Sequence, residues 1–210
     1  MLWSGLKALV RNAGVFALFL GADVGGQALL VWIVPIESAS RVLWTSSLVL
    51  SLLWHVLCGC YLLFAAVRSG GQDGVRAGLR DVWVGTSTRL FPIAGTLVLV
   101  GAATVTGLVV FTWLGVAVLL ALGLVPLAAA AGEPNPLRSG LAALARHALG
   151  YVWVVAVGVL VLALVSVAAG LVALYWPTPL AQVVAMTSEG VVVLWLACSL
   201  APTVVAGAGR

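Results

Sequence analysis

One carboxylate stands in the middle of a long apolar stretch. Asp23 lies between Ala13 and Val34, Gln27 follows one helical turn later, and that stretch holds no other charged residue. A carboxylate at the centre of a membrane helix costs at least about 2.5 kcal/mol to insert, so such residues usually serve a function. Asp23 and Gln27 are therefore a candidate intramembrane polar site that binds a proton or a cation. The alternative is a protonated or hydrogen-bonded Asp23 at a helix contact or against a partner subunit.

A histidine and two cysteines form a second group of possible ligands. His55 lies midway between Arg41 and Arg68, close to Cys58 and Cys60. At about 100° per helical residue, Cys60 lies about 140° from His55. A tetrahedral zinc site needs four ligands, so we predict no metal site. One histidine is enough as an axial ligand, which makes His55 a candidate ligand for a haem or a chlorophyll-type pigment. The alternative is a hydrogen-bonded histidine without a cofactor.

Three arginines stand at the edges of apolar segments. Arg11, Arg80 and Arg146 each follow a short Gly-Leu motif. Arginine near a membrane surface pairs with anionic lipid headgroups, so these residues are candidate headgroup contacts. The alternative is an anchor of topology, whose aliphatic stem lies along apolar surface while its charge reaches water.

The chain carries none of the short motifs that mark common catalytic sites. It has no G-x-S-x-G nucleophile turn, no H-E-x-x-H zinc motif and no phosphate-binding loop. We also expect no charged residue within the cores of the third to sixth spans. Such an inventory is poor for an ion-coupled transporter or an intramembrane hydrolase, so we predict a non-catalytic protein.

The composition determines the solvent in which these residues act. Of the 210 residues, 63% are hydrophobic and only 8% are charged, against about 25% charged in soluble domains. The chain is therefore predicted to be one membrane domain over residues 1–210. Its net charge of +4 comes from residues that flank apolar segments, which indicates contact with membrane lipids and not with nucleic acid.

Apolar length predicts an all-α integral membrane fold with six transmembrane helices. The expected spans cover about 14–34, 42–67, two segments within 91–131, 149–174 and 190–206. The uncharged stretch 91–131 is about twice as long as one span needs, so we place a tight turn at 111–115. Short interfacial helices are expected at the N-terminus, over 75–88 and after Pro136. Residues 181–189 are expected on the membrane surface.

The basic residues are distributed unequally between the two sides of this arrangement. Nine of the ten Lys and Arg residues fall on one side, and only Arg41 falls on the other. Basic residues in short loops remain cytoplasmic. Both termini are therefore predicted to be cytoplasmic.

A short motif occurs three times. Residues 4–9, 77–82 and 139–144 each contain a small residue, Gly-Leu, two variable residues and an aliphatic residue. Repetition at such a period indicates repeated structural units. The predicted units are three quasi-repeated helical hairpins over about 1–74, 75–136 and 137–210. Asp23 has Thr96 and Gly158 as its counterparts, so the repeat itself does not require a carboxylate.

These three Gly-Leu units, each followed by a hairpin, resemble bacterial six-helix repeat membrane proteins. That class includes the membrane domain fused to some glycerophosphodiester phosphodiesterases. The resemblance implies a multi-pass protein of the bacterial cytoplasmic membrane. No segment corresponds to the phosphodiesterase catalytic domain, so no activity is implied.

Three functions remain open. The leading prediction is an accessory or structural subunit, or a scaffold, bound to other membrane subunits, because polar pathways and large loops are not evident. The alternative is a small permease or lipid-handling protein that acts through Asp23 and the arginines at the inner edge. A second alternative is a subunit that binds haem or pigment through His55.

Overall fold

The computed structural model describes residues 1–33, 41–70, 76–175 and 178–205. These residues form helices and no strands. The helices are α1 (Leu2–Arg11), α2 (Ala13–Ile33), α3 (Arg41–Gly70), α4 (Leu79–Val110), α5 (Thr112–Leu122), α6 (Val125–Ala131), α7 (Pro136–Ala173) and α8 (Thr178–Val205).

The all-α membrane fold is confirmed. The described residues contain six segments long and apolar enough to cross a membrane, provided by α2, α3, α4, α5 together with α6, α7 and α8. The tight turn expected at 111–115 is present at its start. There, Phe111 adopts an extended conformation (φ −162°, ψ 123°) between α4 and α5. Helices α4 and α5 approach each other closely at this turn, because a Cβ on Gly107 would lie only 2.8 Å from the Cα of Gly115.

Two of the three expected interfacial helices are separate segments. The first, α1, ends at Arg11, and the buried Asn12 stabilises the corner. The Asn12 side chain donates to the Ala8 carbonyl (2.9 Å) and accepts from the Ala77 amide (2.8 Å). The third is the start of α7, which His147 separates from the span by its non-helical backbone (φ −123°, ψ 25°).

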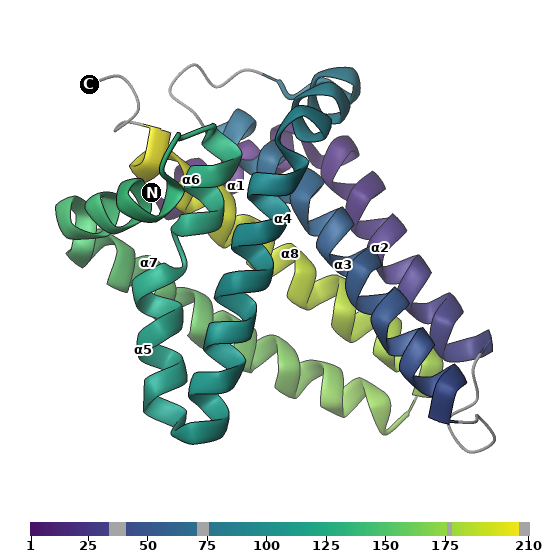
Figure 1. Cartoon of the computed structure of the whole chain (residues 1–210). Helices are drawn as coiled ribbons and strands as arrows, with labels where there is room; N and C mark the ends of the chain where they lie inside the picture. The colour runs from purple at the N-terminus through teal and green to yellow at the C-terminus, as the bar shows by residue number, and fades with distance from the viewer. Residues whose placement is uncertain (34–40, 71–75, 176–177, 206–210) are drawn as a thin grey trace.

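The expected second interfacial helix is not a separate element. Instead, α4 runs without interruption from Leu79 into the span and contains Pro92 in its interior. Proline removes one backbone hydrogen bond and bends a helix without ending it when packing holds both sides. Val82 and Thr86 are fully buried before the proline, and Ile93 is fully buried after it. In Figure 1 the first turns of α4 lie at an angle to the rest of the helix.

Residues 181–189 do not form a surface segment, contrary to expectation. They continue α8 without a break and belong to its membrane-spanning part, which starts at the buried Ala181. The fourth span differs too, because Gly123 and Leu124 divide it into α5 and α6. The short α6 is buried from Val125 to Ala130.

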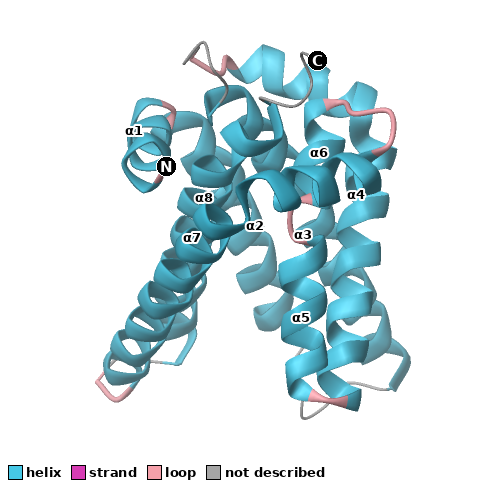
Figure 2. Cartoon of the chain, turned by 90° about the vertical axis from the view of Figure 1, so that its left-hand side faces the viewer, coloured by secondary structure: helices cyan, strands magenta, loops and turns pink. Residues whose placement is uncertain are grey.

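The helices define two ends of the bundle. We call the end that holds α1 and α6 the α1 end, and the end that holds the α4–α5 turn the turn end (Figure 1). The pairs α2–α3, α4–α5 and α7–α8 pack together, and α1 packs on α8. Toward the turn end, α7 diverges from α5 (Figure 2).

Candidate functional site

Asp23 and His55 form an ion pair in the middle of the membrane-spanning bundle. Asp23 Oδ2 lies 2.8 Å from His55 Nδ1. The pairing follows from the antiparallel α2–α3 hairpin, because each residue lies near the middle of its helix. At this distance one proton lies between the two atoms, whichever of them formally carries it. The sequence indicated these residues as separate candidates, and the tertiary structure brings them together.

Gln27 joins α2 to α3 one turn nearer the turn end. Its Nε2 donates to the Ser51 carbonyl (3.0 Å), and Ser51 Oγ donates to Gln27 Oε1. Gln27 is four residues after Asp23, and Ser51 is four residues before His55. The two contacts therefore follow the register of one antiparallel helix pair. Asp23 and Gln27 both line one pocket, described below, and their role as a polar site stays a prediction.

Trp54 adds a third link between the same two helices. Its indole Nε1 donates to the Ala22 carbonyl (3.0 Å). The indole lies directly over Gly26, where any Cβ would collide with the ring. A larger residue than glycine at this position would therefore displace the indole.

Glu189 is a charged residue that we did not expect within a span. It lies on α8, and its Oε1 accepts a hydrogen bond from Ser166 Oγ of α7 (3.0 Å). The expectation of uncharged cores in the later spans is therefore wrong for α8. Helix α8 continues through 181–189, and this continuation places Glu189 within the span.

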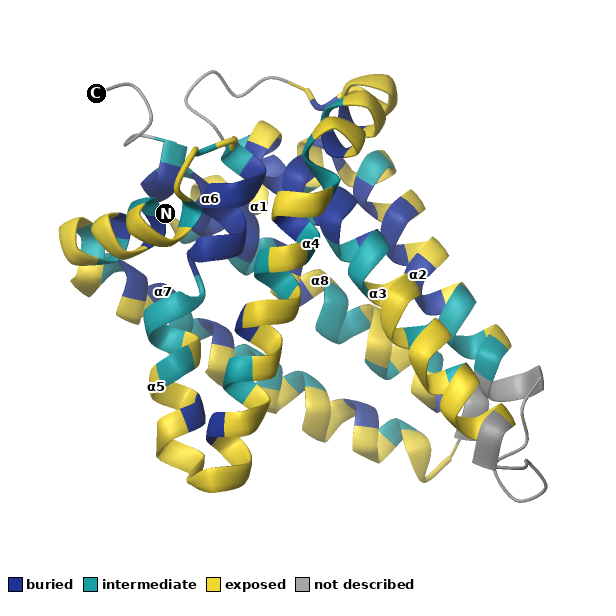
Figure 3. Ribbon diagram, in the orientation of Figure 1, coloured by how far each residue is buried: buried dark blue, intermediate teal, exposed yellow. Residues whose placement is uncertain are grey.

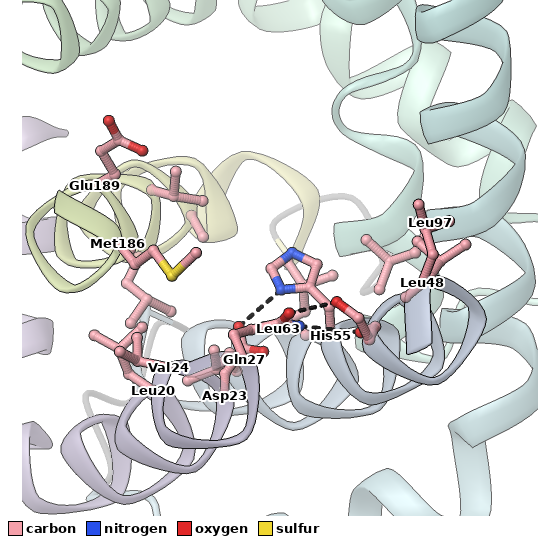
Figure 4. Close-up of a pocket in the computed structure, with 18 residues that line it drawn as sticks. Leu20, Asp23, Val24, Gln27, Leu48, His55, Leu63, Leu97, Met186 and Glu189 are labelled. Atoms are coloured by element: carbon pink, nitrogen blue, oxygen red, sulfur yellow. Dashed lines mark hydrogen bonds and ion pairs between the residues drawn. The ribbon is translucent and has the colours of Figure 1, made fainter. Parts of the chain in front are cut away.

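A pocket connects these groups. It has a volume of about 660 Å³ and is lined by α2, α3 and α8, with Leu97 added by α4. His55 projects from α3 into its middle, and Glu189 stands on the α8 side (Figure 4). The rest of the described lining is aliphatic apart from Gly59, Gly190, Asp23, Gln27, Ser51 and Met186, and it contains no benzene or indole ring, lysine or arginine.

The two members of the ion pair differ in exposure. The Asp23 side chain is 9% exposed and the His55 side chain 65%. Asp23 Oδ1 is buried and accepts no hydrogen bond from the described residues. The ring nitrogen of His55 that does not contact Asp23 points into the open part of the pocket (Figure 4).

The candidate lipid-contacting arginines lie elsewhere. Arg11, Arg80 and Arg146 all belong to the α1 end, and none of them lines the pocket. Arg146 Nε donates to the Ala142 carbonyl of its own helix (3.2 Å), and Arg80 is exposed. The structure therefore does not bring these residues to Asp23, and their contact with lipid headgroups stays a prediction.

The cysteines are buried and free. Cys58, Cys60 and Cys198 form no disulfide. Over the described parts of the chain, no three His, Cys, Asp or Glu side chains are grouped so that they could hold a metal ion.

Sequence reasoning missed four residues of this region, namely Ser51, Trp54, Ser166 and Glu189. One signal could have paired Asp23 with His55. Two consecutive antiparallel helices bring their midpoints to a similar depth, so the two candidates could have been tested for a shared register.

The comparisons with known proteins identify no relative. No protein-family model matches the chain, and neither a curated protein nor a solved structure resembles it at a significant level.

Proposed function

We propose that the protein is a small multi-pass permease or lipid-handling protein whose ligand binds between α2, α3 and α8. The observation that carries the proposal is an ion pair, Asp23–His55, set in the wall of a pocket of about 660 Å³ halfway along the spans. Ionisable residues at this depth are costly and mark ligand, ion or proton pathways. Pockets of this volume hold molecules of drug size.

The ion pair supplies a site for one exchangeable proton. With the proton between Nδ1 and Oδ2 alone, the pair carries one negative charge. A second proton on the exposed side of the imidazole makes the pair neutral. A charged ligand in the pocket favours one of these two states, so ligand binding and proton binding are linked. This property suits a proton-coupled permease.

The proposed role is non-catalytic. Ser51 is the one hydroxyl-bearing residue in the described lining of the pocket. Its Oγ donates to Gln27 Oε1, and it is thus oriented toward the amide and not toward His55. An activated serine instead needs its hydroxyl hydrogen-bonded to a general base.

The proposed setting is a bacterial cytoplasmic membrane with both termini in the cytoplasm. Eight described Lys and Arg residues belong to the α1 end, whereas Arg41 begins α3 at the other end. This distribution supports the orientation through the positive-inside rule. The bacterial assignment rests on the resemblance to six-helix repeat membrane proteins.

A second candidate is the accessory or structural subunit of a larger membrane complex. It is favoured by the spans of α4 and α7, of which only 17% is buried within this chain. A partner subunit could cover these faces, although lipid would serve equally well. Toward the turn end, α7 also diverges from its neighbour α5 (Figure 2).

A cofactor-binding subunit is the third candidate. Carboxylates often accept a hydrogen bond from one nitrogen of a histidine whose other nitrogen binds a metal. Asp23 and His55 have this relation. A haem iron or a pigment magnesium would then contact the nitrogen that faces the pocket.

One purification separates the three candidates. The tagged chain is extracted from native membranes in mild detergent, and its bound proteins, small molecules and absorbance spectrum are measured. The matched variant is Val193→Trp, which fills the pocket from α8. A small molecule that accompanies the wild type but not Val193→Trp would support the permease or lipid-handling role.

Three other outcomes would overturn that role. A stoichiometric membrane subunit without a bound small molecule would favour the accessory subunit. A haem or pigment absorbance band that disappears in His55→Leu would favour the cofactor-binding subunit. A chain that purifies alone and empty, and that loses no function in cells when Val193→Trp is introduced, would exclude a ligand in this pocket.

A further inference from the structure

The charge of the pocket limits which ligands it can accept. Its titratable lining residues are Asp23, His55 and Glu189, and the described lining contains no lysine or arginine. With Glu189 ionised, the pocket carries one or two negative charges, depending on the proton state of the Asp23–His55 pair. In a medium of low dielectric constant this charge attracts a cation and repels an anion.

Glu189 is the more exposed of the two carboxylates that line the pocket, since Asp23 is buried. It is partly buried, and Ser166 occupies only its Oε1. A carboxylate can accept several hydrogen bonds, so Oε2 can accept from a donor in the pocket. Asp23 is a second carboxylate that can accept from a ligand. Its side chain is 9% exposed, and its Oδ1 has no hydrogen-bond donor among the described residues.

The type of cation follows from the rest of the lining. Quaternary ammonium groups bind best against aromatic faces. The described lining offers no Phe, Tyr or Trp and is formed mainly by aliphatic side chains of α2, α3 and α8. Carboxylates instead favour a cation that donates N–H hydrogen bonds. Aliphatic walls favour an alkyl chain attached to that cation.

We infer that the pocket binds a protonated alkyl amine, whose ammonium group donates to Glu189 and whose chain lies along the leucines of α3 and α4. This inference rests on the proposed function and names its ligand class. The bound charge also favours the negative state of the Asp23–His55 pair, so amine binding releases a proton from that pair.

The test compares four probes that share a ten-carbon chain: decylamine, decyltrimethylammonium, decanol and decanoate. Each is added at pH 7 to the purified full chain in zwitterionic nanodiscs, and the thermal unfolding midpoint is followed by tryptophan fluorescence. We expect decylamine to raise the midpoint by several degrees with saturation, since a ligand at 100 times its Kd adds about 2.7 kcal/mol. The other three probes should shift it by less than a third as much.

Two variants assign the effect to Glu189. Glu189→Gln should lose at least ten-fold in decylamine affinity. The matched control is Glu133→Gln, because Glu133 also accepts a hydrogen bond from a serine, Ser139 (2.8 Å), but lies outside the pocket. Its affinity should stay within two-fold of the wild type. If Glu189→Gln does not fold, Val193→Trp replaces it and should also abolish the decylamine shift.

The remaining outcomes overturn the inference in distinguishable ways. If decanol or decanoate gives the saturable shift and Val193→Trp removes it, the ligand class is wrong while the proposed function stands. If decyltrimethylammonium binds as tightly as decylamine, the requirement for N–H donors is wrong. If no probe gives a shift that Val193→Trp removes, both the inference and this pocket as a ligand site are overturned.

Discussion

The α1 end and the turn end of the bundle differ in how their helices meet. At the α1 end, side chains from five helices are completely buried, as the dark region at the top of Figure 3 shows. They are mostly small: Cys60, Ala65, Ala66, Ala128, Ala130, Ala143, Cys198, Ser199 and Ala201. Toward the turn end the helices separate and large side chains such as Phe111 and Trp113 are exposed. Small residues permit close helix packing in membranes, so the α1 end holds the bundle together and leaves room for a pocket beyond it.

Single glycines also differ in how closely they are packed. Gly5 packs against the Ser199 backbone, and Gly140 lies against Val125. Both glycines belong to the repeated Gly-Leu motif. Gly140 contacts the last span of the preceding unit, whereas Gly5, in the first unit, contacts the last span of the third. At Gly14, Gly21 and Gly25 on α2, by contrast, an added Cβ would meet nothing within 4 Å.

The largest predicted effect is at the α1 end. In Gly5→Ala the new Cβ would lie 2.7 Å from the Ser199 amide nitrogen and 2.8 Å from its Cα, so backbone must move. We expect the free energy of unfolding to fall by about 3 kcal/mol, which is the upper end of the usual range for an overpacked core. Thermal unfolding in detergent micelles measures it, with Gly14→Ala as the matched control. A Gly5→Ala midpoint equal to that of the control would contradict the close packing.

The next effect concerns the polar pair in the pocket wall. His55→Leu leaves Asp23 buried with neither oxygen paired, whereas Asp23→Leu combined with His55→Leu removes the charge. Leaving the buried Asp23 carboxylate without its partner costs more than replacing both side chains. We expect the double variant to be more stable than His55→Leu by about 2 kcal/mol.

A double-mutant cycle from unfolding in mixed micelles gives this coupling directly, with Asp23→Leu alone as its fourth member. A coupling free energy within error of zero would show that Asp23 and His55 do not interact in the folded protein.

A smaller effect tests the α2–α3 contact beside the pocket. In Gly26→Ala the methyl group displaces the Trp54 indole, which then loses its hydrogen bond to the Ala22 carbonyl. The expected loss is about 1 kcal/mol, the usual net value of one hydrogen bond. Gly25→Ala is the control and should be no less stable than the wild type. Equal unfolding midpoints for the two variants would disprove the Trp54 contact.

The smallest effect is expected at the membrane surface of the α1 end. Arg146→Gln removes an exposed charge whose Nε bonds only within its own helix turn. The free energy of unfolding should change by less than about 0.5 kcal/mol. Affinity for vesicles or nanodiscs rich in anionic lipid should fall by about 1 kcal/mol if Arg146 contacts headgroups. Lipid affinity equal to that of the wild type would leave Arg146 as an anchor of topology alone.

Local pattern was enough for most of the fold. Apolar length placed the six spans, and the uncharged stretch predicted the turn that forms at Phe111. Two local predictions were wrong, namely the separate interfacial helix over 75–88 and the surface segment over 181–189. Buried residues on both sides of Pro92 keep α4 continuous. Residues 181–189 continue α8, so Glu189 lies within the span of that helix.

The sequence by itself determined that this chain lies in a membrane, how often it crosses and which single residues are costly there. These properties depend on side-chain hydrophobicity and charge, which act locally along the chain. Only the tertiary structure decided that Asp23 meets His55, that Gln27 meets Ser51 and that Glu189 lines the same pocket. Those contacts depend on the rotation and register of helices far apart in sequence, which the packing of small residues at the α1 end sets.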